Sequence, residues 1–437
     1  MSELIPFAVA LVGAIGFGAW LLPWPSRRVV RPATVAEIVA DAPARLRAAV
    51  HVFADPFYTD LMFATLGLGA PEKGFPYVEF YDYDLHGLTV EIRMLGGQSL
   101  RDWTDEKTLD ELAAYMGVDR VTAQPADPGW VRLQVRVHDT LAAPATAPEV
   151  VHNEVDLEAV PVGVREDGWP WLLKVLYAHI LLAGATGSGK GSVLWSIIAG
   201  IGPAIKAGLV DVWMADPKGG MEFGRGSKLW VRFEWTADGI LAMLGEAVTI
   251  MEERAARMRE AGIRKLVPSA DEPLILIIVD EAAALSSYAT REQQEEFRRL
   301  TGLLLSKGRA VGVSVVAALQ DPSKETMPNR QLFPVRIGLR LDEPTQTTMV
   351  HGQGSRDRGA RCDQIPDTTP GVGYVGEDGT AEFVRVRAFW ISDEDADAIV
   401  AAYAPDQPDT APAEDYSGFD PDDLGDEDLG NGGGMAA

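Results

Sequence analysis

The chain has 437 residues and 47% hydrophobic content, which is long enough for two or three domains with cores of their own. Its single cysteine, Cys362, excludes an intramolecular disulfide and is typical of a reducing compartment, and six scattered histidines argue against a zinc site. A formal charge of −25 argues against a broadly basic surface that coats nucleic acid, although it leaves room for a localised basic channel.

The N-terminal segment is long and apolar. Residues 4–26 carry no charge and match the roughly 20 residues that cross a bilayer. Arg27, Arg28 and Arg31 follow, and a basic flank on this side places the rest of the chain in the cytoplasm. We therefore predict a single-pass anchor in the cell membrane over residues 1–31. A cleaved signal peptide is the alternative, but no positive residue precedes the apolar run.

Residues 32–150 predict a small α+β module. A helical pattern broken at Pro43 is followed by strand-like alternation at Leu85–Leu95, a helix at Trp103–Met116 and further alternation at Trp130–Val137. This module either connects the membrane to the following domain or seeds oligomerisation, and a passive linker is an equally good interpretation.

Residues 151–403 predict one α/β domain. Apolar strands alternate with helices such as Gly239–Ala261 and Glu292–Lys307, which indicates a parallel sheet covered on both faces. The expected strands are Ile180–Ala183, Leu209–Ala215, Leu274–Val279, Val313–Ala318 and Val335–Leu341. The remaining residues, 404–437, contain ten acidic residues and no Lys or Arg, and we expect them to be disordered.

The string GATGSGKGS lies between an apolar strand and an amphipathic helix, which is the context of a phosphate-binding loop. Glycines let the backbone N–H groups wrap a polyphosphate, the helix N-terminus adds partial positive charge, and the lysine reaches the β and γ phosphates. The predicted ATP-binding residues are Gly184, Ala185, Thr186, Gly187, Ser188, Gly189, Lys190, Gly191 and Ser192.

One position of this loop departs from the usual pattern. A hydroxyl residue normally follows the lysine and binds Mg²⁺, but here Gly191 follows Lys190 and the serine comes one residue later. One residue is about 100° of helical rotation, so Ser192 replaces that ligand only if the turn is remodelled. Otherwise water and Asp280 hold the metal, and the sequence leaves both possibilities open.

Two adjacent acids follow the apolar strand in LILIIVDEAAAL. Ionised carboxylates at such a position need partners, and in phosphoryl-transfer sites Asp280 would hold Mg²⁺ while Glu281 activates the attacking water. The alternative is that the pair caps the following helix.

Two further strand ends carry polar residues. Gln320 ends another strand, where an amide can contact the γ-phosphate or the water, and the turn MADPKGGMEF contains Asp216 and Lys218. From the residues alone, a simple turn is the preferred interpretation of the second segment.

Together these segments resemble the motor domain of the FtsK/SpoIIIE DNA translocases. The resemblance covers about residues 160–400 and rests on AHILLAGATGSGKGS, ADPKGGMEF, MEERAARMREAGIRKL, LIIVDEAAAL, LLSKGRAVGVSVVAALQDPS and PVRIGLRLDEPTQTTMVHGQG. The K-G-S form of the loop, GVREDGWPW and the expected membrane span are most similar to the actinobacterial TraSA-type transfer proteins of conjugative elements.

This resemblance implies a RecA-like fold, a homo-hexameric ring and ATP hydrolysis that drives double-stranded DNA through the pore. It implies that Lys190 binds phosphates, Asp280 binds Mg²⁺, Glu281 is the catalytic base and Gln320 senses the γ-phosphate. Arg309, in the K-G-R-A segment, becomes the candidate for an arginine supplied to a neighbouring subunit. Since Asp321 follows Gln320 where the family usually has arginine, any role of that arginine does not transfer.

We therefore predict a membrane-anchored, ATP-driven DNA translocase for the transfer of plasmid or integrative-element DNA in conjugation, working with other mobile-element transfer proteins. Lys324 and Arg330 are candidate DNA contacts, because a pore reads phosphates and shape with few side chains. The alternatives are a type VII protein-export ATPase and a nucleotide-binding scaffold that does not hydrolyse, the latter motivated by Gly191.

Overall fold

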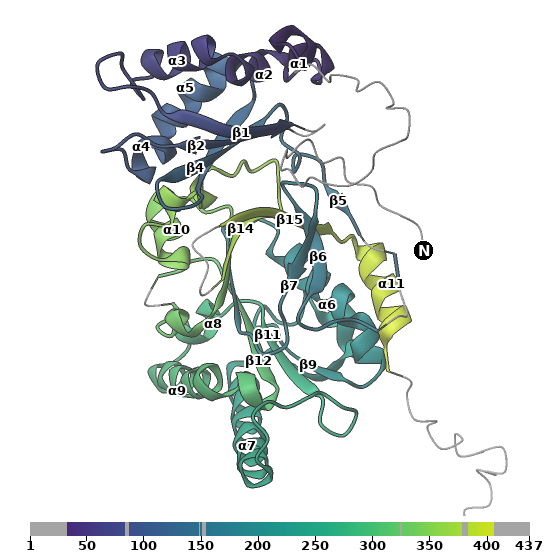
Figure 1. Cartoon of the computed structure of the whole chain (residues 1–437). Coiled ribbons are helices and arrows are strands. Elements are labelled where there is room, and N and C mark those ends of the chain that lie inside the picture. The colour runs from purple at the N-terminus through teal and green to yellow at the C-terminus, as the bar shows by residue number, and fades with distance from the viewer. Residues whose placement is uncertain are drawn as a thin grey trace, which may run out of the picture.

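The computed structural model describes residues 33–83, 87–147, 149–150, 154–323, 326–377 and 383–405. The expected anchor at residues 4–26, Lys324 and nearly all of the acidic tail lie outside these residues. Within the described part, no helix is both long enough and apolar enough to cross a membrane. Figure 1 shows two units, a smaller N-terminal module at the top and a larger α/β unit below it.

The smaller module is built on a four-stranded antiparallel sheet in the order β1-β2-β4-β3. Alternate residues of its central strand β4 are buried, as the sequence pattern predicts, and they pack with the helices in a core of their own. The elements are α1 (Val35–Asp41), α2 (Arg47–Ala54), α3 (Pro56–Thr65), β1 (Tyr77–Tyr83), β2 (Gly87–Arg93), α4 (Leu100–Thr104), α5 (Glu106–Met116), β3 (Arg120–Pro125) and β4 (Trp130–Arg136).

The larger unit has an eleven-stranded sheet in the order β10-β9-β11-β12-β8-β13-β14-β15-β6-β7, with β5 paired to β15. Its strands are β5 (Ala145–Thr146), β6 (Val160–Arg165), β7 (Pro170–Leu173), β8 (Ile180–Ala183), β9 (Val210–Ala215), β10 (Trp230–Glu234), β11 (Leu274–Val279), β12 (Val313–Leu319), β13 (Val335–Leu339), β14 (Val372–Glu377) and β15 (Val384–Trp390).

The prediction of a parallel sheet is correct for one half and wrong for the other. The six strands from β10 to β13 are parallel, and β14, β15, β6 and β7 extend the sheet in antiparallel fashion. The strands β6 and β7 are only partly buried, and they pair through a tight turn at Gly168 rather than through a crossover helix. Parallel pairing is predicted from the helical sequence pattern of a crossover connection, and a short turn between two strands has no such pattern.

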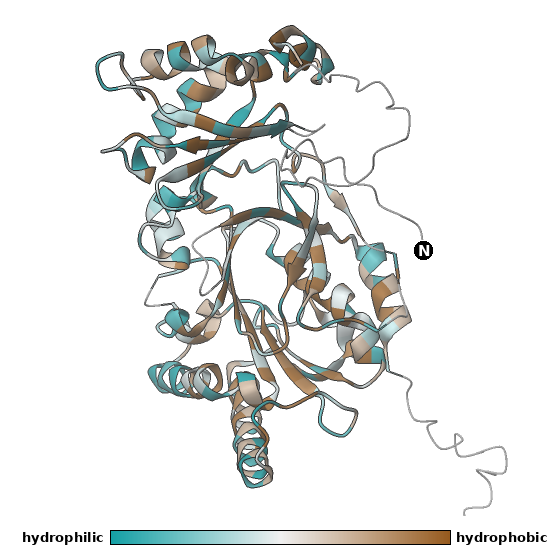
Figure 2. Ribbon diagram, viewed as in Figure 1, coloured by the Kyte–Doolittle hydropathy of each residue, from teal (hydrophilic) through white to brown (hydrophobic). Residues whose placement is uncertain are grey.

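Helices cover both faces of the parallel half. Alternate residues of β11 point to opposite sides: Leu276 and Ile278 belong to the core that contains α6 and α11, whereas Ile275 and Ile277 belong to the core that contains α7 and α9. Figure 2 shows these central strands as the most hydrophobic part of the unit. The helices are α6 (Lys190–Lys206), α7 (Ala237–Ala261), α8 (Ala283–Ser286), α9 (Arg291–Lys307), α10 (Pro344–His351) and α11 (Asp393–Tyr403).

Buried arginines join the segment between the two units to the larger sheet. Arg385 of β15 is 4% exposed, and its guanidinium donates to Asp139 at 2.6 Å and to Glu166 at 3.2 Å. Arg387, on the same face of β15, donates to the carbonyls of Leu141 and Ala142. The carboxylates on Arg385 satisfy a charge that would otherwise be costly to bury.

Candidate functional site at the carboxyl ends of the central strands

The loop from Gly184 to Gly189 connects β8 to α6, which begins at Lys190. Gly187 and Gly189 have φ of 75° and 96°, a left-handed conformation that glycine adopts without strain. Gly189 also lies against another backbone segment, because a Cβ atom there would come within 2.3 Å of the nitrogen of Gly371. That nitrogen donates to the carbonyl of Ser188 at 2.8 Å, so the loop is held in shape from outside.

Lys190 is 8% exposed, and its ammonium donates to the carbonyl of Gly184 at 2.7 Å. Burial lowers the pKa of this lysine, although the carboxylates of Glu281 and Asp280 act in the opposite direction. Its charge therefore lies in a poorly solvated loop, where its attraction to phosphate is stronger than in water.

Asp280 and Glu281 lie at the carboxyl end of β11 and are 1% and 7% exposed. Burial raises the pKa of both carboxyls, opposed in Asp280 by the ammonium of Lys218 at 2.7 Å. Oε1 of Glu281 accepts from the backbone nitrogen of Gln320 at 3.4 Å, and its Oε2 has no partner among the described residues. A buried carboxylate oxygen without a partner can accept a proton from a bound water.

Gln320 joins the phosphate loop to the acids. It follows β12, which lies between β8 and β11 in the sheet. Its backbone nitrogen reaches Glu281, and its side-chain oxygen accepts from the hydroxyl of Thr186 at 3.1 Å. A change at the phosphate loop is thereby linked to the acid through one residue.

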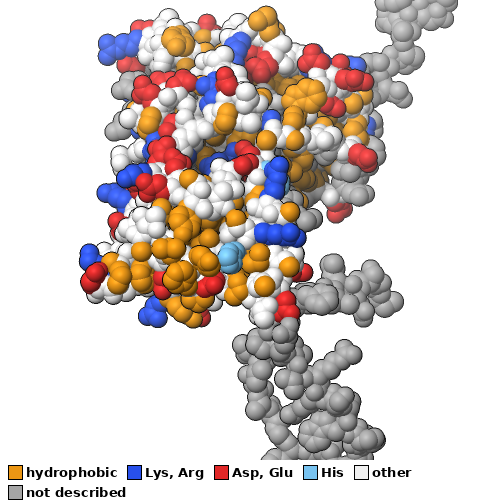
Figure 3. Space-filling view, turned by 90° about the horizontal axis from the view of Figure 1, so that it is seen from above, with side chains coloured by type: hydrophobic (Ala, Val, Ile, Leu, Met, Phe, Trp, Pro, Cys, Tyr) orange, Lys and Arg blue, Asp and Glu red, His pale blue; other side chains and the backbone are white. Residues whose placement is uncertain are grey.

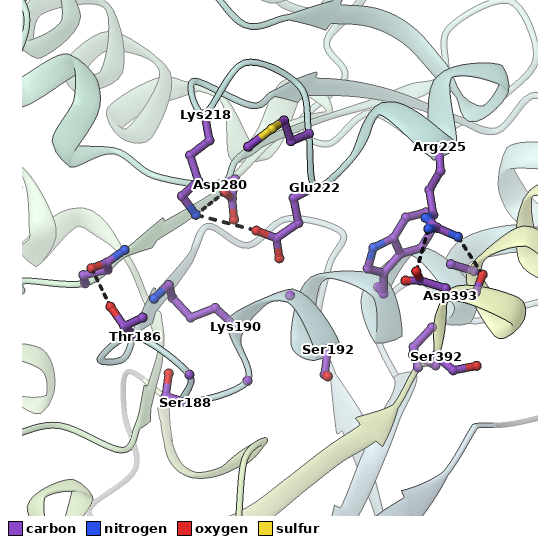
Figure 4. Close-up of a pocket in the computed structure, with 18 residues that line it drawn as sticks. Thr186, Ser188, Lys190, Ser192, Lys218, Glu222, Arg225, Asp280, Ser392 and Asp393 are labelled. Carbon is purple, nitrogen blue, oxygen red and sulfur yellow. Dashed lines mark hydrogen bonds and ion pairs between the residues drawn. The ribbon is translucent and has the colours of Figure 1, made fainter. Parts of the chain in front are cut away.

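The turn after β9 covers this group, and here the preferred interpretation of a simple turn does not account for what the structure shows. Asp216 is fully buried, and its carboxylate accepts from the backbone nitrogens of Lys218, Glu222 and Phe223 at 3.1 Å each. The turn so formed places the ammonium of Lys218 between Asp280 and Glu222, as Figure 4 shows.

Lys190, Asp280 and Gln320 border one cavity of about 560 Å³, within the range of small-molecule sites, whereas Glu281 and Asp216 are not among its lining residues. One end is polar and contains the loop from Thr186 to Ser192 with Asp280 and Gln320, and the other end contains Trp195, Ile391 and the start of α11. Ser188 lines the polar end, and its buried hydroxyl has no partner among the described residues. The glycine loop, the lysine and the unpartnered oxygens together fit a nucleotide polyphosphate with a divalent cation.

Two predicted residues lie outside this cavity, and a third borders it without facing the carboxylates. Arg309 is exposed and precedes the amino end of β12, so it lies across the sheet from the cavity of its own chain. Arg330 donates to the carbonyl of Pro322 at 3.0 Å. Ser192 borders the cavity, but its hydroxyl points away from the carboxylates of Asp280 and Glu222 in Figure 4.

The sequence reasoning missed two residues of the site. Arg340 follows β13 and donates to the carbonyl of Thr186 at 2.7 Å, which braces the phosphate loop from its other side. Glu222 lies against Gly191, as described below. Arg340 directly follows β13 and Glu222 lies in the turn that follows β9, so both belong to segments at the carboxyl ends of parallel strands.

Comparison with known proteins agrees with this geometry. Residues 146–272 match the model of the FtsK/SpoIIIE family. The transfer protein TraSA of Streptomyces ambofaciens is 29% identical over 350 residues, covering 73% of this chain and 80% of that protein. The DNA translocase FtsK of Streptococcus agalactiae is 26% identical over 351 residues, covering 74% of this chain but only 41% of that longer protein.

Among solved structures, the pCW3 conjugation coupling protein TcpA, a monomer form with ATPγS, superposes with a TM-score of 0.53. It is 20% identical and covers 78% of this chain and 97% of its own, which shows a shared α/β fold. Residues 146–272 therefore carry an FtsK/SpoIIIE family domain, as the motifs indicated.

Proposed function

We propose that this chain is an ATP-driven translocase that moves double-stranded DNA of a plasmid or integrative element during conjugation. The observation that carries the ATPase part is that Lys190, Asp280 and Gln320 border one cavity and that Glu281 accepts a hydrogen bond from the backbone of Gln320. The DNA and conjugation part rests on the names of the relatives TraSA, FtsK and TcpA.

The residues of one protomer divide the work of hydrolysis. The loop N–H groups and Lys190 bind the phosphates, and the carboxylate of Asp280 would hold Mg²⁺. Mg²⁺, when bound, neutralises charge on the phosphates. Glu281 orients the attacking water and takes its proton at Oε2, a transfer favoured by the raised pKa of this carboxyl. Gln320 responds to the γ-phosphate through its contacts with Thr186 and Glu281.

The assembly is proposed as a homo-hexameric ring held at the membrane by residues 1–31, with the motor in the cytoplasm and the acidic tail beyond it. Arg309 acts on the site of a neighbour, which is supported by its exposure and by its distance from its own cavity across the sheet. Lys324 and Arg330 contact DNA phosphates in the pore.

The module of residues 32–150 connects the membrane anchor to the motor or seeds the ring. One feature supports a packing role: α3 exposes Phe57, Tyr58 and Leu61, which are 68%, 38% and 44% exposed. Figure 3 looks down on this module and shows hydrophobic side chains gathered on it between charged ones.

ATP turnover measured with and without duplex DNA tests the proposal. We expect duplex DNA and Mg²⁺ to stimulate turnover, and Lys190→Ala to abolish nucleotide binding because the loop loses its cation. The control is Arg291→Ala, which removes one positive charge at an exposed position of α9 and should bind nucleotide normally. Stimulation by a secreted peptide instead of DNA would favour protein export, and nucleotide binding without any turnover would favour a scaffold.

A further inference from the structure

Gly191 occupies the first turn of α6, where phosphate loops usually carry a metal-binding hydroxyl. A Cβ atom built at this glycine would lie 2.3 Å from Oε1 of Glu222. The carboxylate oxygen therefore fills the space that a side chain at position 191 would take. Figure 4 shows this carboxylate above the start of α6, on the side that faces Asp280.

The backbone that carries Glu222 is fixed by buried contacts. Asp216 accepts hydrogen bonds from the nitrogens of Glu222 and Phe223, both at 3.1 Å. The Phe223 ring is fully buried and stacks on Trp195 of α6, with ring centroids 5.7 Å apart and 20° between their planes. The turn and the helix that begins beside Gly191 are thus packed as one piece, which sets the position of the carboxylate.

Two carboxylates converge on a single cation at this point. The Lys218 ammonium lies 2.7 Å from Asp280 and 3.6 Å from Glu222. The two carboxylates share this one ammonium, and two like charges so placed need a positive charge between them. The same cavity contains the hydroxyl of Ser188, which is 1% exposed and has no partner among the described residues. This buried hydroxyl is a further polar group that can bind a ligand there.

We propose that a carboxylate oxygen of Glu222 replaces the metal-binding hydroxyl that is absent at Gly191. The ammonium of Lys218 occupies the position between Glu222 and Asp280 until a metal–nucleotide complex binds. This inference rests on the proposed ATPase function. Among the described residues no three candidate metal ligands lie together, so the two carboxylates need nucleotide phosphates and water as further ligands. Such a shared shell is the usual one for Mg²⁺, which keeps several waters and takes one or two carboxylates.

The test measures the affinity of the full chain for a fluorescent, non-hydrolysable ATP analogue in EDTA and in Mg²⁺. The ratio of the two affinities is the gain due to metal. We expect Glu222→Gln to leave the affinity in EDTA unchanged or improved, because a negative charge near the phosphates is removed. The gain due to metal should fall by about tenfold or more. Glu295→Gln, at an exposed position of α9, is the control for net charge.

A reciprocal variant separates metal binding from a structural role. Gly191→Thr in the Glu222→Ala background restores a hydroxyl where the carboxylate stood and should recover most of the gain. Mn²⁺ electron paramagnetic resonance with the same analogue gives a second readout, with weaker Mn²⁺ retention in Glu222→Gln and recovery in the double variant.

A wild-type gain in Glu222→Gln would overturn the inference, as would an equal loss of affinity in EDTA and in Mg²⁺ without recovery in the double variant. Failure of the wild-type chain to bind the analogue in either buffer would instead remove the proposed ATPase function.

Discussion

Gly189→Ala is the sharpest test of how the phosphate loop is held. The residue has φ of 96°, and a methyl group there would come within 2.3 Å of the nitrogen and 2.9 Å of the Cα of Gly371. Backbone atoms cannot rotate aside as a flexible side chain can, so the loop and the Gly371 turn must separate. Their separation breaks the hydrogen bond from Gly371 to Ser188.

Three costs add for this substitution. The left-handed conformation costs an alanine about 1–2 kcal/mol, overpacking against fixed atoms costs about 1–3 kcal/mol, and the lost hydrogen bond costs about 0.5–1.5 kcal/mol. The sum is about 2.5–6.5 kcal/mol. Gly187→Ala is the matched control, because its φ is 75° but no atom lies within 4 Å of the new methyl group. It should lose only about 1–2 kcal/mol.

Urea unfolding followed by tryptophan fluorescence measures both variants, together with the affinity for an ATP analogue. We expect Gly189→Ala to lose most of its nucleotide affinity, because the N–H groups of the loop no longer converge, and Gly187→Ala to retain more of it. Equal losses of stability in the two variants would refute the reasoning, since contact with Gly371 would then make no difference.

Four further outcomes are expected. Since burial raises the pKa of the Glu281 carboxyl, ATP turnover should fall as the pH drops through a value above the ordinary pKa of glutamate. The variant Glu281→Gln should bind ATP but not hydrolyse it, and normal turnover in that variant would exclude Glu281 as the base. Burial lowers the pKa of His179 and of His351 to about 3 from 6.5, so below pH 6.5 the unfolded chain takes up protons that the folded chain does not. The free energy of unfolding should therefore fall by about 2 kcal/mol per histidine between pH 7 and pH 5. Urea unfolding midpoints measured at the two pH values should show a smaller decrease in His351→Leu than in the wild-type chain. Arg385→Ala leaves Asp139 and Glu166 without their shared cation and should lower the free energy of unfolding by about 3–5 kcal/mol in the same urea assay; a loss below about 1 kcal/mol would mean that water replaces the guanidinium. Mixing Arg309→Ala with Glu281→Gln subunits should restore part of the turnover if Arg309 serves a neighbouring site, and mixtures as inactive as the separate variants would contradict that role.

The sequence was sufficient for the elements whose pattern is local. Ile180–Ala183 and Leu274–Val279 are strands at the predicted residues, and the long helices α7 and α9 begin within two residues of their predicted starts. Continuous apolar runs and helical periodicity do not depend on distant partners, so they are readable before folding. The same holds for the phosphate loop and the paired acids, since each depends on residues adjacent in the chain.

Pairing between distant segments was beyond the sequence. The antiparallel strands β14, β15, β6 and β7 come from both ends of the larger unit. Their local sequences do not show whether β15 pairs with β6 or remains an edge strand exposed to solvent. The order of the strands was also outside what the sequence predicted: β12 lies between the strand that carries the acids and the phosphate-loop strand, and this places Gln320 in contact with both.

Gly191 shows the division most clearly. Its identity could be read from the sequence as a missing metal ligand, but the residue that fills the space is 31 positions away and comes from another strand end. The sequence determined which chemical groups the chain carries and which segments form helices and strands. The tertiary structure decided which groups meet, because parallel strands bring their carboxyl ends to one edge of the sheet from segments far apart in the chain.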